Sequence, residues 1–167
     1  MTRFTKVSTV LALALVASAT TAQAQSANIN VTANVFQALT VVGNSALAFG
    51  NVFPAIPATV AVTAAGAGKW SVTVGQANAN VNLSFTLPAN LIGPAAATLP
   101  VGSWSGHWAA TDVTSGGTSF TPSAANTAAA LSGSGNLYVY IGATVSPGAA
   151  QAAGAYTAIA TMTVAYF

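Results

Sequence analysis

The sequence predicts an all-β protein, an antiparallel β-sandwich of about seven strands. Short runs of alternating apolar and polar residues recur along the chain, and clusters of Gly, Pro and Ser separate them. The chain contains no convincing amphipathic helical pattern, and its abundant alanines stand at strand spacing or in Gly/Pro-rich loops. Because pattern outweighs the helical propensity of alanine, a sandwich is the leading fold and an eight-stranded barrel the competitor.

Residues 1–24 predict a secretory signal peptide. Arg3 and Lys6 precede the apolar run 10–17, and Ala22-Gln23-Ala24 forms a small-x-small cleavage site before Gln25. A transmembrane anchor needs about 20 apolar residues, and Ser18 interrupts this run too early. We therefore expect a secreted mature chain, residues 25–167, that folds as a single domain.

Removal of the signal peptide leaves almost no charge. The whole sequence has three Lys+Arg and one Asp+Glu, and Lys69 and Asp112 are the two that remain. The absence of a basic patch argues against binding to nucleic acid or to an anionic membrane. Low net charge favours association. The sequence has no cysteine, so we expect packing and strand hydrogen bonds alone to hold the fold.

The first element of the mature chain is a predicted strand at 27–36. Ile29, Val31, Ala33 and Val35 alternate with polar residues in the cleanest two-residue period of the sequence. Residues 39–42 continue or bend this strand, residues 43–45 are predicted as a turn, and Leu47-Ala48-Phe49-Gly50 follows the turn. A loop with Pro54 and Pro57 comes next, and then 58–64 and 69–75, read as a hairpin joined by a Gly-containing turn.

The second half of the chain continues the pattern. Strands are predicted at 81–87, at 103–111 after a loop from 88 to 100, at 136–145 and at 158–167. Residues 112–135 are predicted as a long loop with at most a helical turn near 126–131. In the final strand Met162, Val164 and Tyr166 form one apolar edge. An edge strand needs an outer neighbour, taken either from the same chain or from another molecule.

Several of these features together resemble the spore coat protein U family. They are the signal peptide, the alternating first strand, Leu47-Ala48-Phe49-Gly50, the predicted Val-rich hairpin that follows, and Ala153-Gly154-Ala155-Tyr156 leading into a last strand with a penultimate tyrosine. This family includes the major subunits of archaic chaperone–usher pili, which are fimbria-like surface fibres. The resemblance spans the mature chain and rests mainly on its two ends.

The resemblance implies an incomplete immunoglobulin-like, or pilin-like, sandwich with a groove along its last strand. A periplasmic chaperone would fill that groove first, and an outer-membrane usher would then add the N-terminal strand of the next copy, giving a cell-surface homopolymer that serves cell adhesion. The donor residues would be Ile29, Val31, Ala33 and Val35, and the acceptor edge would include Met162, Val164 and Tyr166. The family usually has a cysteine near the position of Ala38. A first strand that completes its own domain, giving a self-contained secreted binding module, is the alternative.

The mature chain has few residues that could take part in enzyme catalysis. Proton transfer, nucleophile activation and metal binding need several ionisable groups or ligands, and the mature chain offers His107, Asp112 and Lys69 without Cys or Glu. One Asp cannot form a glycosidase carboxylate pair. An exposed loop histidine and a turn-forming aspartate are therefore favoured over a catalytic pair. We expect no enzymatic activity, no cofactor and no metal.

Two further alternatives concern the aromatic residues. Trp104 and Trp108 could stack on sugar rings and make the protein a carbohydrate-binding module, although Trp is more often packing area in a strand. Phe167 could mark the last strand of an outer-membrane barrel. The residues at two-residue spacing from Phe167 are not an apolar band. We therefore expect a protein that is not integral to a membrane.

Overall fold

A computed structural model describes residues 24–167 of the protein, and residues 1–23 of the predicted signal peptide lie outside that range. The chain divides after Asn34 into two units, which are described separately below. Residues 24–34 belong to the first unit and residues Val35–Phe167 to the second. The second unit contains all the strands of the described chain.

The unit from Val35 to Phe167 is an all-β sandwich of two antiparallel sheets, as predicted. In residues 24–167 there is no α-helix, and the one helical segment is the short 3₁₀ turn η1 (Pro94–Ala96). The strands are β1 (Thr40–Ser45), β2 (Ala58–Val60), β3 (Gly68–Thr73), β4 (Asn80–Thr86), β5 (Asn90–Ile92), β6 (Thr98–Ala109), β7 (Thr118–Phe120), β8 (Thr127–Ala130), β9 (Leu137–Val145) and β10 (Thr161–Tyr166).

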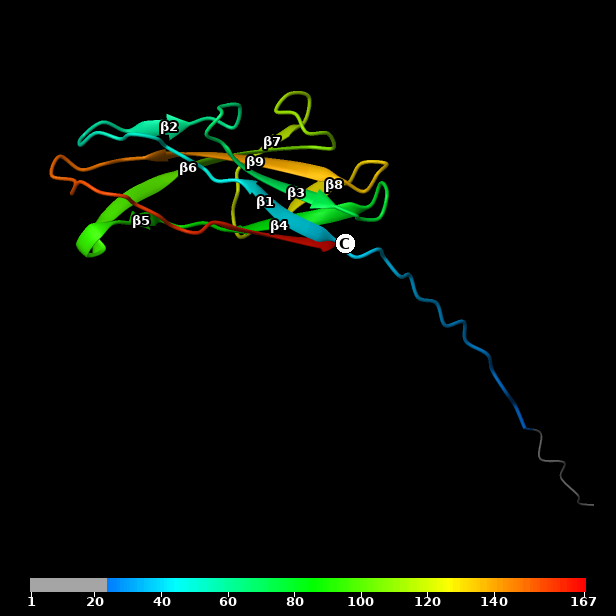
Figure 1. Cartoon of the computed structure of the whole chain (residues 1–167). Helices are drawn as coiled ribbons and strands as arrows, with labels where there is room; N and C mark the ends of the chain where they lie inside the picture. Colours follow the sequence, from blue (N-terminus) through cyan, green and yellow to red (C-terminus); the bar gives the residue numbers. More distant parts are fainter. Residues whose placement is uncertain (1–23) are drawn as a thin grey trace, which may run out of the picture. The chain divides into compact units, whose positions relative to one another are not determined.

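The larger sheet has the order β1-β3-β9-β6-β5, with β2 added to β9 and β7 added to β6. The smaller sheet has the order β10-β4-β8 and packs beneath the larger one (Figure 1). The predicted strands at 81–87, 136–145 and 158–167 correspond to β4, β9 and β10. The sandwich has ten short strands where about seven were predicted, because several loops of the prediction contribute a few residues to a sheet edge.

The predicted hairpin between 58–64 and 69–75 is wrong. β2 pairs with the Ala143–Val145 end of β9, and β3 pairs with residues 137–141 of the same strand, so the two segments lie end to end along β9. Gly142 lies between these two pairings. A Cβ at Gly142 would come within 2.2 Å of the Val60 carbonyl oxygen, so the missing side chain lets the backbone of the 60–68 connection approach β9.

Other differences come from segments that pair with distant parts of the chain. The predicted turn at 43–45 lies within β1, where the register shifts between Gly43 and Ser45. The predicted loop 112–135 contains β7 and β8. The helical turn expected at 126–131 is wrong because β8 pairs with β4, with Ala129 buried opposite Val81. β6 begins at Thr98, inside the predicted loop 88–100.

The hydrophobic core has two clusters. The first lies between the two sheets and includes the fully buried Val72, Leu83 and Leu137, with Met162 of β10 packed into it. The second cluster is smaller, with Leu99, Val101, Ala143 and Val145 as its buried members. Half-buried side chains surround this second cluster, among them Leu47, Phe49, Leu91, Trp104 and Tyr156. The second cluster is therefore bordered by side chains that keep some exposure to solvent.

Candidate functional site

β10 is an edge strand with an apolar inner row, as predicted. Met162 is buried and Val164 and Tyr166 are half-buried, whereas Thr161, Thr163 and Ala165 between them are exposed. Within residues 24–167, β10 pairs with β4 and with no other strand. Its second side therefore presents backbone N–H and C=O groups that another strand can pair with.

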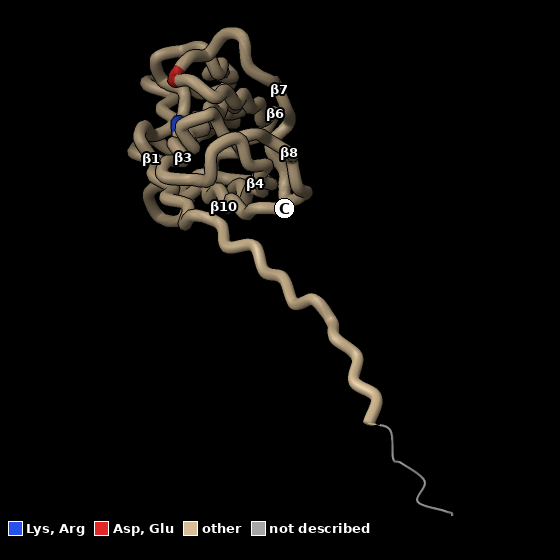
Figure 2. Tube along the Cα trace, turned by 90° about the vertical axis from the view of Figure 1, so that its right-hand side faces the viewer, with Lys and Arg blue, Asp and Glu red and all other residues tan. Residues whose placement is uncertain are grey.

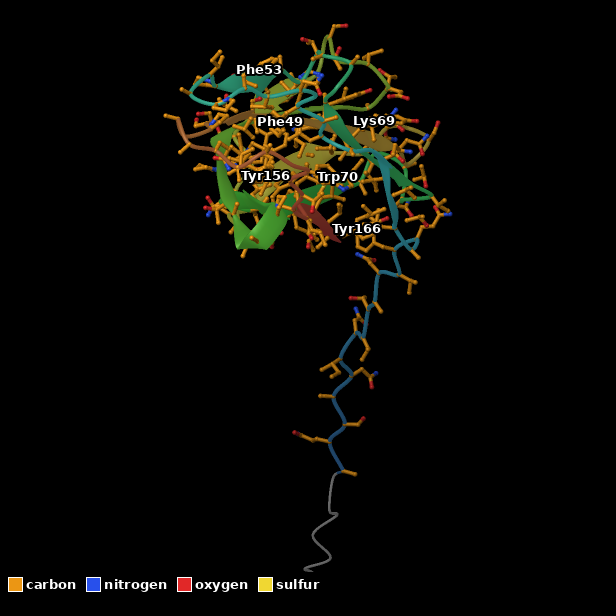
Figure 3. The ribbon with its side chains drawn as sticks, turned by 60° about the vertical axis from the view of Figure 1, so that its left-hand side comes forward. Phe49, Phe53, Lys69, Trp70, Tyr156 and Tyr166 are labelled. Atoms are coloured by element: carbon orange, nitrogen blue, oxygen red, sulfur yellow. The ribbon has the colours of Figure 1, made fainter. Side chains whose placement is uncertain are left out.

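A groove of about 1220 Å³ leads up to this strand. One wall is formed by residues 43–54, which include the end of β1 and the segment after it. The other wall is formed by residues 151–160, directly before β10. The lining between them is mostly apolar and aromatic: Trp70, Leu91, Leu99, Val101, Trp104 and Ile141. Figure 3 shows Phe49, Trp70 and Tyr156, which come from the two walls and from β3, and Tyr166 near the end of β10.

The wall at 151–160 is held in place by Tyr156. The Tyr156 hydroxyl donates a hydrogen bond to the Ala152 carbonyl (2.7 Å) and lies 2.6 Å from Nε2 of Gln151, which donates to it. Thr157 exchanges two backbone hydrogen bonds with Ile92 of β5 (2.8 and 3.0 Å). The Tyr156 ring packs over Gly93, where a Cβ would lie 2.5 Å from the ring. This wall is therefore fixed to the larger sheet at one end and continues into β10 at the other.

The opposite wall begins with β1, which is incompletely covered. Val41 lies opposite Val72 in the β1–β3 register, so the two side chains share one face of the sheet. Val72 is fully buried, but Val41 is 39% exposed. Every residue of β1 is exposed. The inner face of β1 is therefore only partly covered within the described chain.

The predicted donor segment forms no strand in the single chain. No residue from 24 to 39 belongs to a strand, which differs from the prediction for 27–36, because a strand is defined by a partner that supplies its hydrogen bonds. Ile29, Val31 and Val35 are 85–93% exposed, and Ala33 is exposed too. Large apolar side chains in this number are normally found buried.

Trp104 and Trp108 do not form a common surface on which a sugar ring could stack. Trp104 is half-buried against the second core cluster and lines the groove, whereas Trp108 packs against the first cluster. The indole N–H of Trp108 is buried and has no hydrogen-bond partner within residues 24–167. Both side chains therefore provide packing area to the sandwich.

The prediction that His107 is an exposed loop residue is wrong. His107 lies in β6 and is 5% exposed, because Gly117 of the following loop covers its ring. Asp112 pairs with Lys69 instead of His107. The Lys69 ammonium donates to both carboxylate oxygens (2.9 and 3.0 Å), and the Tyr140 hydroxyl donates to one of them. The hydrogen bonds from Tyr140 and then Lys69 lower the pKa of Asp112. This pair lies away from β10 (Figure 2).

Burial, followed by the hydrogen bond to Asp112, raises the pKa of Tyr140 to about 12. The group is therefore an ion pair with a neutral tyrosine, which ties the loop after β6 to the face of the larger sheet. Among residues 24–167, no three His, Cys, Asp or Glu side chains come together as a metal site would require. None of the helices in that range is long and apolar enough to cross a membrane.

Sequence reasoning identified the apolar row of β10 but missed both walls of the groove. For the wall at 43–54, the alternation of Leu47 and Phe49 with small residues partly indicates a buried face. For the wall at 151–160, which is rich in Ala, the sequence shows no such pattern, because the position of this segment depends on the hydrogen bonds of Tyr156. Comparison of the chain with known proteins finds no matching family and no similar curated protein.

Proposed function

We propose that the protein is a structural subunit of an extracellular fibre or surface coat, assembled by strand donation between copies. The segment 27–36 of one copy lies in the groove of the next and pairs with the open side of β10. The observation that carries the proposal is that one chain has both parts. It has an apolar groove whose wall 151–160 continues directly into an unpaired edge strand, and an exposed segment with apolar residues at strand spacing.

The donor row has the length of a short strand. A strand rises about 3.3 Å per residue, so the row from Ile29 to Val35 is roughly 20 Å long. Burying each Ile or Val side chain contributes roughly 1.5–3 kcal/mol, and backbone pairing with β10 adds strength and fixes the register. The alternating polar residues would face outward.

The same exposed surfaces imply partners during export. A free subunit with an open groove and an apolar segment would aggregate, because both features are templates for strand pairing. A periplasmic chaperone that covers the groove and an outer-membrane usher that exchanges it for the next donor segment would prevent this. The resemblance to the spore coat protein U family supports the same assignment, with the cell surface as the final location.

The donor segment is tested by Val31→Asp, with Thr32→Asp as the matched control. Both substitutions add one carboxylate to the same segment, but Val31 is in the apolar row and Thr32 in the polar row. An unpaired charge is costly to bury, so Val31→Asp should abolish polymer and leave monomer, while Thr32→Asp should assemble. Light scattering of the mature proteins measures the outcome.

Equal polymer from the two variants contradicts strand donation. A wild-type chain that stays monomeric, with residues 27–36 protected from protease, contradicts it too and supports the self-contained domain.

A further inference from the structure

The junction between the donor segment and β1 is attached to the last strand. The ring of Phe36 stacks on the ring of Tyr166, with centroids 4.7 Å apart and planes at 21°. The Tyr166 hydroxyl donates to the Gln37 carbonyl (2.8 Å) and accepts from the Gln76 backbone N–H (2.8 Å). We call Phe36, Gln37 and Tyr166 the junction clamp.

The clamp fixes the direction of the chain at the groove. Gln37 lies at the Tyr166 end of β10, and residues 43–54 lie opposite residues 151–160, which precede β10. β1 therefore starts beside the end of β10 and runs in the opposite direction along the groove. For a chain to fill its own groove, its segment 27–35 would have to turn back at residues 36–38 and form a hairpin with β1.

The residues at this point do not favour such a turn. Tight hairpin loops need positive φ angles, which Gly, Asn and Asp adopt most readily. Residues 36–38 are Phe, Gln and Ala, and the positive φ angles of the described residues all lie elsewhere. The stacking of Phe36 on Tyr166 and the hydrogen bond from Tyr166 to the Gln37 carbonyl hold residues 36 and 37 in their present position. A hairpin turn at these residues would have to break both contacts.

We propose that the junction clamp makes strand donation intermolecular, because it keeps the segment 27–35 out of the groove of its own chain. The groove is then left for the segment of a second copy. Phe36 and Tyr166 are positioning residues in this scheme. They direct the segment 27–35 away from its own groove and do not themselves pair with the groove of the second copy. The inference rests on the proposed function and adds the reason why a chain with both complementary parts does not close on itself.

The test replaces the junction with a turn sequence. The double variant Phe36→Asn/Gln37→Gly removes the stacked ring and introduces Asn-Gly, the preferred two-residue hairpin loop. This mature protein should be monomeric, and its residues 27–35 should be protected from hydrogen exchange and protease. Adding Val31→Asp to it should expose the segment again, which distinguishes self-closure from a failure to fold. A double variant that polymerises like wild type overturns the inference.

Phe36→Leu separates the ring from the turn. This variant loses the stacking on Tyr166 but gains no turn residue, so its polymer fraction should fall between those of wild type and the double variant. A Phe36→Leu chain that assembles as fully as wild type overturns the role of the clamp. If wild type itself forms no polymer, the proposed function fails, whereas polymer from both wild type and the double variant rejects this inference alone.

Discussion

At the scale of single residues, Lys69 and Asp112 are the Lys, Arg, Asp and Glu side chains of residues 24–167, and they bind each other. Their side chains are 22% and 49% exposed, and ion pairs at the surface contribute about 0–1 kcal/mol. Tyr140 also donates to Asp112 and holds the same loop. Residues 24–167 therefore have no unpaired Lys, Arg, Asp or Glu side chain, which suits close packing of copies because no such side chain has to be desolvated alone.

The pair predicts a specific pH dependence. The pKa of Asp112 is lowered from its ordinary value of 3.8, so the pair stabilises the fold fully above that pH and loses its effect as pH falls through the lower folded value. Asp112→Asn should therefore reduce the free energy of unfolding by at most about 1 kcal/mol at pH 7, and the difference should vanish in strong acid. Urea unfolding in the monomeric Val31→Asp background measures both.

Asp112 is the one acidic side chain of the natural sequence, and the carboxylate that Val31→Asp adds is present in both proteins compared, so its titration cancels in their difference. A difference between the two proteins that persists unchanged at about pH 2 would show that the ion pair is not its cause.

At the scale of elements, β9 organises the larger sheet, since β2, β3 and β6 all pair with it. Gly142 is the residue that permits this, because a Cβ there would lie 2.2 Å from the Val60 carbonyl oxygen and 3.1 Å from the carbonyl carbon of Ala61. Both neighbours are backbone atoms and cannot rotate away. β2 and the connection to β3 therefore depend on the absence of a side chain at this position.

Gly142→Ala should destabilise the protein by roughly 1–3 kcal/mol, the usual cost of forcing atoms into a packed site. Gly102→Ala in β6 is the control, since a Cβ at Gly102 meets nothing within 4 Å, and its effect should stay within about 0.5 kcal/mol. Thermal and urea unfolding compare the two. Equal stability of the two variants would contradict the close approach of β2 to β9.

The elements also show what the sequence could predict. The strands β4, β9 and β10 can be predicted from local sequence, because residues such as Leu83, Val139 and Met162 alternate with polar or exposed neighbours and pack into one core. For β2 the strand was predicted but its partner was wrong, and β8 was missed, because the partners of these strands lie about 85 and 48 residues away in the sequence. The groove walls were missed for the same reason: Tyr156 and Phe49 come together through the sheet and not through local sequence.

At the scale of the whole molecule, one chain contains two parts whose apolar residues or backbone groups lack a partner within residues 24–167. The sandwich has a groove and an open strand edge at β10, and the segment 27–36 has an apolar row without cover. The strand donation that we propose accounts for both with one contact. It also explains the lack of cysteine and charge, since a ladder of backbone hydrogen bonds and apolar packing would join the copies.

The most direct measurement mixes a donor-deficient chain with an acceptor-deficient chain. Val31→Asp places a charge in the apolar row of the donor segment. Ala160→Asp places a charge on the groove wall, at a half-buried residue in line with Met162, and Thr161→Asp on the exposed side is its control. Each deficient chain alone should remain monomeric, because each lacks one of the two parts, and the Thr161→Asp chain should polymerise.

Mixed together, the two deficient chains should form a dimer of one copy each, in which the intact segment of the Ala160→Asp chain fills the intact groove of the Val31→Asp chain. Mass measurement by light scattering, with one chain isotope-labelled for mass spectrometry, identifies this product. A mixture that stays monomeric while wild type assembles, or polymer from either deficient chain alone, would contradict donation of residues 27–36 to the groove beside β10.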